Sequence, residues 1–299
     1  MTQAMLVVNP SSGKEEGKNL VGQLVTVLMD QYDSLSIRTT HQEGDASHFA
    51  REAAREKYEA LYLMGGDGTI NEGLQGIAQE DHRPTLGLVP LGTVNNAASM
   101  LGFSNNYREA IQQFSQVKRV KMDIGRLNDR YFISSVVTGV LASSLKDVSS
   151  KEKTQLGFWA YLKEALDALG NDRAHPFKLE IDGVAREESL SLIVVSLGPS
   201  LLRIQDLFPE ATIDDGYLNL AGLKEAKLGD KLGVVSSIFS QGGVVNTDKL
   251  DYTRCKSCKI FPLDPQVANV SIVDGDQGPG FPLEIEVLPS HIEVFAVDK

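Results

Sequence analysis

The sequence contains only two cysteines, no long apolar run and no surplus of positive charge, and each absence excludes a class of protein. Two cysteines are too few for the disulfide framework of a secreted domain, so we expect a reducing compartment. No apolar run approaches the ~18 residues that a membrane-spanning helix needs, and the mean hydropathy is −0.13. The chain enters an apolar strand pattern without a basic segment before it, so we expect no signal peptide. Together these features predict a cytoplasmic protein with no transmembrane segment.

The balance of charge excludes a further class, because the formal net charge is −11. A strongly acidic chain is poorly suited to nucleic acid, and we expect no such partner. The five histidines are scattered and form no zinc-protease motif. Cys255 and Cys258 have C-x-x-C spacing, but no second pair exists to complete a zinc site. We therefore interpret both as ordinary strand cysteines.

The chain is long enough for two domains with real cores, with 299 residues of which 42% are hydrophobic. From residue 1 to about 122, apolar strand patterns alternate with helical ones. This rhythm predicts an α/β domain with a mostly parallel sheet. The expected strands are 4–8, 34–39, 60–64 and 85–89.

Residues 123–290 have a different rhythm, of short strands separated by turn residues. It predicts a second domain that is mainly an antiparallel β-sandwich. Helical patterns at 158–169 and 228–239 interrupt it, and the first carries an apolar stripe that suits either a core-facing helix or the lip of a lipid pocket. Hairpin turns are expected at 129–130 and 182–183. The expected strands are 120–127, 131–138, 177–181, 189–196, 217–221, 256–261, 267–273 and 283–288.

A glycine-rich turn at residues 65–68 is the most informative local feature. It surrounds Asp67 and precedes a helical pattern in which Thr69 and Glu72 are spaced as a capping box, which predicts a helix start at Thr69. Glycines allow positive φ and close backbone approach, and the first amides of a helix attract phosphate. Asp67 would repel bare phosphate but suits Mg²⁺ carried by a nucleotide. A purely structural turn explains the same residues equally well.

Two other strand ends carry similar turns, at residues 9–13 and 90–95. Because the carboxyl ends of parallel strands meet at one edge of a sheet, three such turns favour a nucleotide site there. Two known phosphate motifs are excluded. The turn at 65–68 lacks the G-x-G-x-x-G spacing and its acidic ribose partner. The Gly-Lys pair at 13–14 is followed by an acid rather than the Ser or Thr of a P-loop.

Taken together, these motifs resemble those of the soluble bacterial diacylglycerol kinase family of lipid kinases, which is related to sphingosine and ceramide kinases. The resemblance runs in order along nearly the whole chain. It implies a nucleotide-binding domain with an NAD-kinase-like fold over 1–122, to which a strand at 291–299 returns, and a β-rich lipid-substrate domain over 123–290. The motifs that carry it are Asn9-Pro10 with Gly13, Gly65-Gly66-Asp67-Gly68-Thr69 with Asn71-Glu72, Pro90-Leu91-Gly92-Thr93 with Asn95, Pro209 with Ala211 and Asp214-Asp215-Gly216, and Asp274-Gly275-Asp276.

The resemblance implies an ATP-dependent kinase that phosphorylates a lipid hydroxyl, such as that of diacylglycerol, with Mg²⁺. Asp67 would act through the Mg²⁺. Thr40 matches a family nucleotide contact, although a structural strand-end threonine explains it equally well. The residues implied for nucleotide binding are Asn9, Pro10, Ser11, Ser12, Gly13, Thr40, Gly66, Asp67, Gly68, Thr69, Ile70, Asn71, Glu72 and Thr93.

Two aspartate-rich turns carry the remaining implied roles. Asp274 and Asp276 match the family's general-base element, with Asp276 in place of the usual Glu, and an ionised carboxylate can accept a hydroxyl proton. A structural Mg²⁺ would take the carboxylate of Asp215 and the main-chain carbonyls of Thr212 and Tyr217. Read alone, both motifs are more typical of turns.

The chain departs from the family pattern at two positions. Asn96 stands where the family usually has Asp, without the basic residue that usually follows nearby, and Asp276 is one methylene shorter than Glu. These changes keep a second hypothesis open, a non-catalytic nucleotide- or lipid-binding relative. A third hypothesis, a soluble kinase resembling NAD kinases, is disfavoured by the long β-rich half.

A lipid kinase must meet its substrate at the membrane surface, so the resemblance also implies peripheral binding at the inner leaflet. The net negative charge is awkward there, and a local basic face would be needed. Four lysines would supply one, although a solvated helix surface explains them better. The sequence leaves open whether the chain forms a homodimer. The lysines are Lys146, Lys151, Lys153 and Lys163.

Overall fold

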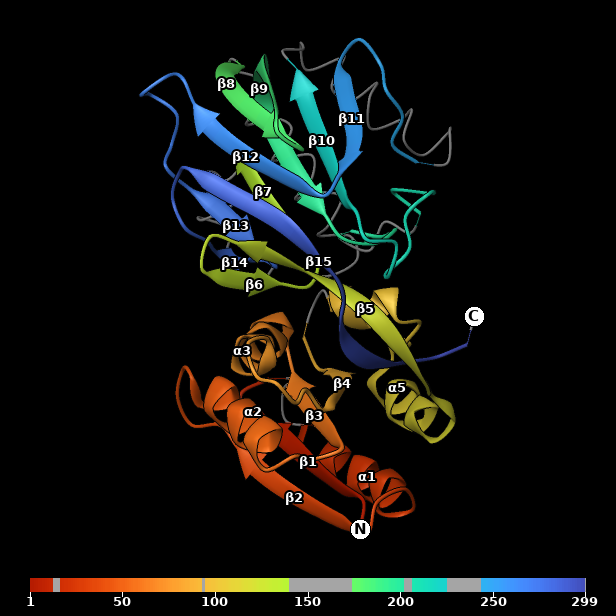
Figure 1. Cartoon of the computed structure of the whole chain (residues 1–299). Helices are drawn as coiled ribbons and strands as arrows, with labels where there is room; N and C mark the ends of the chain where they lie inside the picture. The colour runs from red at the N-terminus through yellow and green to blue at the C-terminus, as the bar shows by residue number, and fades with distance from the viewer. Residues whose placement is uncertain (13–16, 93–94, 140–173, 202–205, 225–242, 299) are drawn as a thin grey trace. The chain divides into compact units, whose positions relative to one another are not determined.

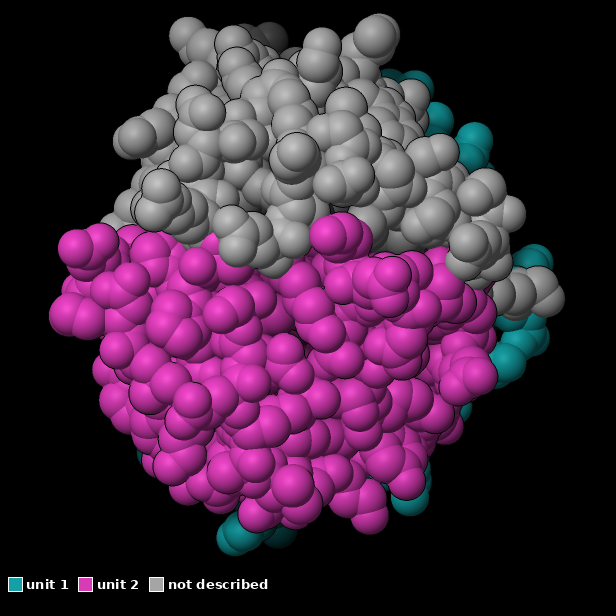
Figure 2. Space-filling view, turned by 90° about the horizontal axis from the view of Figure 1, so that it is seen from above, with its two compact units in different colours: residues 1–124, 289–299 teal, residues 125–288 magenta. Residues whose placement is uncertain are grey.

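The computed structural model describes residues 1–12, 17–92, 95–139, 174–201, 206–224 and 243–298. The chain divides into two compact units, coloured separately in Figure 2. Unit 1 comprises residues 1–124 and 289–299, and unit 2 comprises residues 125–288. Among the described helices, none is long and apolar enough to cross a bilayer. The helices expected at 158–169 and 228–239, and the four lysines, lie outside the described residues.

Unit 1 is built on a parallel sheet with the strand order β15-β4-β3-β1-β2 (Figure 1). Four of its strands match the predicted ones, and the last part of β15 adds a fifth beside β4, through Val294 and Leu86. Helices α2 and α3 pack against each other, and α1 packs against α5. The strands are β1 (Gln3–Val8), β2 (Ser34–Thr39), β3 (Ala60–Gly65), β4 (Thr85–Pro90) and β15 (Leu283–Ala296). The helices are α1 (Gly17–Met29), α2 (Asp45–Arg55), α3 (Asp67–Ile77), α4 (Asn96–Met100), α5 (Tyr107–Gln113) and the short 3₁₀ helix η2 (Phe114–Gln116).

The centre of the unit 1 sheet is buried on both faces, as a parallel sheet covered by helices requires. Every residue of β3 and of β4 is buried. Tyr62 on β3 stacks on Phe295 at 5.5 Å between ring centroids, and the ring of Phe114 meets it edge-on at the same distance. A side chain at Gly87 on the neighbouring strand would collide with the ring of Tyr62, so this position must be small. The C-terminal strand is therefore part of the unit 1 core.

Unit 2 is a β-sandwich with antiparallel strand pairing, as predicted. Hydrogen bonding gives the orders β14-β13-β7-β9-β10-β11 and β9-β8-β12-β15-β5-β6, and β9 belongs to both. The long strand β9 pairs with β8 through its first half and with β7 and β10 through its second half. The strands are β5 (Lys118–Leu127), β6 (Arg130–Phe132), β7 (Ser135–Gly139), β8 (His175–Ile181), β9 (Val184–Ser196), β10 (Leu218–Lys224), β11 (Leu250–Cys255), β12 (Ser257–Pro262), β13 (Ser271–Val273) and β14 (Asp276–Gln277).

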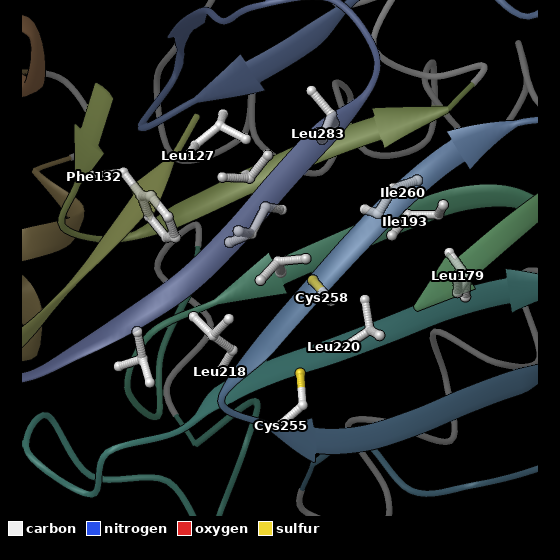
Figure 3. Close-up of a cluster of buried hydrophobic side chains, with 14 of the residues drawn as sticks. Leu127, Phe132, Leu179, Ile193, Leu218, Leu220, Cys255, Cys258, Ile260 and Leu283 are labelled. Atoms are coloured by element: carbon white, nitrogen blue, oxygen red, sulfur yellow. The ribbon is translucent and has the colours of Figure 1, made fainter. Parts of the chain in front are cut away.

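The core of the sandwich contains both cysteines. Figure 3 shows Cys255 and Cys258 among leucine and isoleucine side chains, including Leu218 and Leu220 of β10. Both thiols are free and fully buried. The Cys255 side chain and burial raise the pKa of the Cys258 thiol well above its ordinary value. These cysteines therefore behave as small apolar core residues.

Two sequence predictions about unit 2 were wrong in detail. The strand expected at 131–138 is interrupted after Phe132, so that β6 and β7 are separate. The hairpin turn expected at 129–130 lies one residue earlier, because Leu127 pairs with Arg130 and Asn128 adopts a φ of 53°. The turn at 182–183 is confirmed, with positive φ at both positions.

Candidate functional site

The first candidate region is the carboxyl edge of the unit 1 sheet, where the strand-end loops are joined by main-chain hydrogen bonds. The amide of Asn9 donates to the carbonyl of Met64, and that of Leu91 donates to Gly65, each over 2.9 Å. The amide of Thr40 donates to Val8 over the same distance. The four loops that follow β1, β2, β3 and β4 are therefore held beside one another at this edge.

Gly66 and Gly92 lie close together in two of these loops. A Cβ on Gly92 would lie 2.8 Å from the Cα of Gly66, which is closer than real Cβ contacts allow. Gly66 has a φ of −87° and a ψ of −177°, a conformation open to any residue. The glycines are needed here for close backbone approach rather than for positive φ.

Helix α3 begins at Asp67, two residues earlier than predicted, and the predicted capping box is absent. Its N-cap is Gly66, and no side chain caps the helix. Thr69 instead accepts a hydrogen bond from the side-chain amide of Asn9 over 2.9 Å. Glu72 accepts one from the main-chain N–H of Gly44 over 3.0 Å. Both side chains join α3 to neighbouring loops, so neither is available to the start of its own helix.

Asp67 is the carboxylate at the centre of this edge. It accepts main-chain hydrogen bonds from Asn95 at 3.1 Å and from Asn96 at 3.2 Å, one on each oxygen. Asn95 reaches this position by adopting a φ of 53°. Its side chain closes the preceding loop, because Oδ1 accepts from the amide of Gly92 and Nδ2 donates to the carbonyl of the same residue. Asn95 therefore holds in place the loop that contacts Asp67.

Asn96 contributes an unusual group next to Asp67. The residue is 8% exposed, and its Oδ1 is buried without a hydrogen-bond partner among the described residues. A buried acceptor without a partner is costly. Carboxylate and amide oxygens are the ligands that Mg²⁺ prefers, so the pair of Asp67 and Asn96 suits the Mg²⁺ that accompanies a nucleotide.

The residues predicted to bind nucleotide lie along this edge wherever the structure describes them. Ser11 donates its amide to Oδ1 of Asn9 over 3.0 Å, which shapes the loop after β1. Ile70 is buried in the unit 1 core, so only its main chain faces the edge. The described set comprises Asn9, Pro10, Ser11, Ser12, Thr40, Gly66, Asp67, Gly68, Thr69, Ile70, Asn71 and Glu72, whereas Gly13 and Thr93 lie outside the described residues.

The second candidate region lies within unit 2 and is the two-residue hairpin turn between β13 and β14. Asp274 and Gly275 both have positive φ, 51° and 96°, which is the conformation that matches strand twist in such hairpins. The carboxylate of Asp274 is buried and accepts three main-chain hydrogen bonds, from Ile133, Ser134 and Ser135, at 2.8 to 3.0 Å. These bonds occupy the amides that separate β6 from β7, and they explain the interrupted strand.

Asp276 differs sharply from Asp274 although only one residue separates them. It is exposed, at the first position of β14, and pairs with Val273 across the hairpin. Asp274 therefore fixes the turn, and Asp276 projects from it. A carboxylate that remains accessible to a substrate hydroxyl is the better candidate for a general base.

The third candidate region, also within unit 2, is the turn that precedes β10. Oδ1 of Asp215 accepts from the amide of Tyr217 over 2.9 Å, and Oδ2 accepts from the amide of Thr212 over 2.8 Å. The guanidinium of Arg254 lies 2.7 Å from the same Oδ2. It also lies over the ring of Tyr217, 4.6 Å from the centroid. The carboxylate is thus already neutralised by a cation of the chain itself.

The amides of Thr212 and Tyr217 meet the carboxylate of Asp215, whereas the predicted Mg²⁺ ligands are the carbonyls of these two residues, so a metal ion at this turn stays a prediction. Both oxygens of Asp215 already accept hydrogen bonds, and a metal ion would have to share the carboxylate with Arg254. Within the described ranges, no group of three or more His, Cys, Asp or Glu side chains is placed to hold a metal ion. We derive no chemical step through a metal at this turn.

The residues that sequence reasoning missed are partners rather than motif members. Arg254 lies 39 positions from Asp215, and the amides that hold Asp274 lie about 140 positions away. Asn95 was noted only as part of a motif. Its use at a positive φ was predictable, because asparagine tolerates this conformation better than most residues.

Comparison with known proteins places these features in a family. Residues 3–127 match the family described as the diacylglycerol kinase catalytic domain. Residues 134–296 match the family described as the YegS C-terminal NAD kinase beta sandwich-like domain.

Individual relatives match over almost their full length. A diacylglycerol kinase of Staphylococcus carnosus (strain TM300) is 32% identical over 98% of this chain and 94% of its own length. A diacylglycerol kinase of Staphylococcus aureus (strain bovine RF122 / ET3-1) is 33% identical over 98% and 92%. The crystal structure of a diacylglycerol kinase from Bacillus anthracis str. Sterne shares the fold, with a TM-score of 0.77 at 23% identity over 98% of this chain and 96% of that one.

Proposed function

The chain belongs to the diacylglycerol kinase family, and we propose that it is an ATP-dependent lipid kinase that uses Mg²⁺ to phosphorylate a lipid hydroxyl, with diacylglycerol as the first substrate to test. The family supports a kinase. The observation that carries the proposal in this chain is the pair of aspartate turns: Asp67 at the edge of the unit 1 sheet, and exposed Asp276 on a turn fixed by Asp274.

Unit 1 would bind the nucleotide. The loop amides at the carboxyl edge of the sheet and the start of α3 supply N–H donors and the positive end of a helix dipole for the phosphates. When bound, Mg²⁺ would spread the charge of the transferring phosphoryl group. Asp67 and Oδ1 of Asn96, which has no hydrogen-bond partner among the described residues, are the oxygens that would hold it, directly or through water. Asn95 and Gly92 keep the loop that presents these groups in one conformation.

Unit 2 would supply the base. Asp276 would accept the proton of the lipid hydroxyl as that oxygen forms its bond to the γ-phosphorus, while the bond from the γ-phosphorus to the β-phosphate oxygen breaks and ADP leaves. Asp274 would act as a positioning residue, because its three main-chain hydrogen bonds fix the turn from which Asp276 projects.

A second candidate function is a nucleotide- or lipid-binding protein that no longer catalyses transfer. The features that favour it are Asn96, which removes a negative charge beside Asp67, and Asp276, which is shorter than the family's glutamate. Both residues still offer oxygen atoms, so the changes weaken the site rather than remove its chemistry. We therefore place the kinase first.

A cytoplasmic lipid kinase would meet its substrate at a membrane surface. We therefore expect the protein to bind peripherally at the inner leaflet. The chain's net charge of −11 works against an anionic leaflet. The homodimer left open by the sequence stays untested.

The experiment that tests the proposal is transfer of labelled γ-phosphate from ATP with Mg²⁺ to a total lipid extract, with NAD as a parallel acceptor. Label in a lipid product would support the lipid kinase. Label in NAD would support the kinase that resembles NAD kinases. Binding of ATP, measured by a shift in melting temperature, without label in either acceptor would favour the non-catalytic relative.

A further inference from the structure

A row of polar residues crosses four neighbouring strands of the unit 2 sandwich. Ser135 on β7 pairs with Ser196 on β9, which pairs with Asn219 on β10, which pairs with Arg254 on β11. Residues directly opposite one another in a sheet place their side chains on the same face. The four side chains therefore form one continuous line across the sheet, which we call the polar row.

Three members of the polar row are buried, and the fourth, Arg254, keeps 27% of its side chain exposed. Ser196 and Asn219 are completely buried, and Ser135 is 5% exposed. Side chains alternate along a strand, so the residues next to each row member point to the opposite face of the sheet. On β10 these are Leu218 and Leu220, which Figure 3 shows in the sandwich core. Burying hydroxyl and amide groups costs free energy that apolar residues would not cost, which suggests that the row serves a purpose other than stability.

Hydrogen bonds hold the members of the row in place. Ser196 donates its hydroxyl to the carbonyl of Ser134 over 3.3 Å. Asn219 donates its Nδ2 to the carbonyl of Ser196 over 3.4 Å, and its Oδ1 accepts from the hydroxyl of Tyr252 over 2.8 Å. The side chain of Asn219 is thus fixed on one side by β9 and on the other by β11.

The two ends of the polar row are the two aspartate turns. At one end Ser135 donates its amide to Asp274 over 3.0 Å, and the amide of Asp274 donates back to the carbonyl of Ser135 over 2.9 Å. At the other end Arg254 forms its ion pair with Asp215 at 2.7 Å. The cross-strand pairs of the row, together with the hydrogen bonds of Ser196 and Asn219, thus connect the turn that carries Asp276 with the turn before β10.

We propose that the polar row is a positioning device, in which the Asp215–Arg254 ion pair, through Asn219 and Ser196, sets the position of the Asp274 turn and hence of Asp276. This inference rests on the proposed function, because it assigns Asp276 as the base. It gives the turn before β10 a role in catalysis that requires no metal ion. Ser196, Asn219 and Arg254 act as positioning residues, since none of them has to touch a substrate.

The test removes single hydroxyl groups. Ser196→Ala and Tyr252→Phe should each lower kcat by roughly tenfold to a hundredfold, because a base displaced by about 1 Å loses this much. KM for ATP should stay constant, because the predicted nucleotide residues are all in unit 1. Ser191→Ala is the matched control. Ser191 lies on the same strand, is equally buried, and donates its hydroxyl to the carbonyl of Leu223 over 3.1 Å, but is not in the row. It should change kcat by less than about twofold, as expected of a residue with no part in positioning the base.

Two double variants separate positioning from loss of structure. Ser196 and Arg254 are two strands apart, about 10 Å, a separation at which independent effects multiply. If the row is connected, the double variant Ser196→Ala/Arg254→Gln should instead lower kcat only slightly more than the more damaging of the two single variants does. With Asp276→Asn already present, Ser196→Ala should lower the residual kcat no further.

Three outcomes would overturn the inference. The first two apply if the parent is active. If Ser196→Ala changes kcat no more than Ser191→Ala does, the row does not position the base. The same conclusion follows if the effects of Ser196→Ala and Arg254→Gln on kcat simply multiply. A folded parent that is inactive with every lipid would refute the proposed function, and the positioning role with it.

Discussion

Asn96 donates its main-chain N–H to Oδ1 of Asp67 over 3.2 Å, while its own side-chain Oδ1 is buried without a partner in the described part of the chain. One residue thus orients the central carboxylate through its main chain and carries a second, buried oxygen on its side chain. The relationship explains how the chain can tolerate asparagine at a position where the family usually has aspartate. The backbone contribution is independent of the side chain, and the amide oxygen can still act as a neutral metal ligand.

Asn96→Asp should therefore have opposite effects on the empty and the loaded protein. Without a metal ion, a second carboxylate beside Asp67 introduces repulsion, and the melting temperature should fall. With Mg²⁺ and ATP the added charge should be compensated, and turnover should rise by up to about tenfold, or ~1.4 kcal/mol of barrier. Melting curves with and without Mg²⁺-ATP, together with kcat, check this. A variant whose turnover is unchanged or lower at saturating Mg²⁺ would contradict it.

The two aspartates of the Asp274–Gly275–Asp276 turn should separate stability from catalysis. Asp274→Asn leaves a buried amide N–H facing an NH₂ group, which should cost roughly 1–3 kcal/mol of unfolding free energy. Asp276→Asn changes an exposed residue, so unfolding free energy should change by less than about 0.5 kcal/mol, while kcat should fall by about 10² to 10⁴.

Urea unfolding and lipid phosphorylation on the same preparations measure both quantities. Asp276→Glu serves as the control that keeps a carboxylate at the turn and should keep activity. If Asp276→Asn were fully active, Asp276 would not be the base.

The turn before β10 predicts an unusual response to Mg²⁺. Because Arg254 already pairs with Asp215, Mg²⁺ should not raise the melting temperature of an Asp67→Asn protein, in which the nucleotide-linked metal position is disabled. Arg254→Gln in that background should lower the melting temperature and then allow Mg²⁺ to recover part of it, since the carboxylate is released. The opposite result would be a Mg²⁺-dependent rise in the melting temperature of the Asp67→Asn protein that retains Arg254, and loss of that rise when Asp215→Asn is added. It would show that a metal ion binds at this turn.

Part of this arrangement was predictable from sequence, and part was not. Most strands of both units follow from local patterns, and the fold class was confirmed. However, β11 and β14 were not expected, and only the last three residues of the strand expected at 267–273 form β13. Thr69 and Glu72 have the spacing of a capping box, yet they bind Asn9 and Gly44 instead. Sequence spacing cannot show that a polar side chain has a better partner in a distant loop.

The same limit applies in unit 2. The alternation over residues 131–138 continues through Ile133 and Ser134, but their amides turn aside to Asp274, about 140 positions later. The ion pair of Asp215 with Arg254 is likewise set by strand pairing, because Arg254 reaches the turn through its register beside Asn219. Such partners are visible only when the fold is known.

Acid should weaken the loop that follows β2, which contributes to the nucleotide edge. The amides of His41 and Gln42 donate to Asp45 and hold the pKa of its carboxyl below the ordinary value. A depressed pKa in the folded state gives stability that is complete above the unfolded value of about 4 and is lost as pH falls through the folded value. Asp45→Asn should therefore lose less stability than the parent between about pH 5 and pH 2. Thermal melting of the parent and of Asp45→Asn across that range measures it.

Transfer of phosphate from ATP to diacylglycerol is the measurement that tests the central claim most directly. The purified parent, Asp67→Asn and Asp276→Asn proteins would each be incubated with γ-labelled ATP, Mg²⁺ and vesicles that contain diacylglycerol, and the lipids extracted and separated. We predict label in a phosphorylated lipid with the parent and almost none with either variant, while all three remain folded. A folded parent that leaves diacylglycerol and every other lipid hydroxyl unlabelled, or an Asp67→Asn protein as active as the parent, would contradict the account.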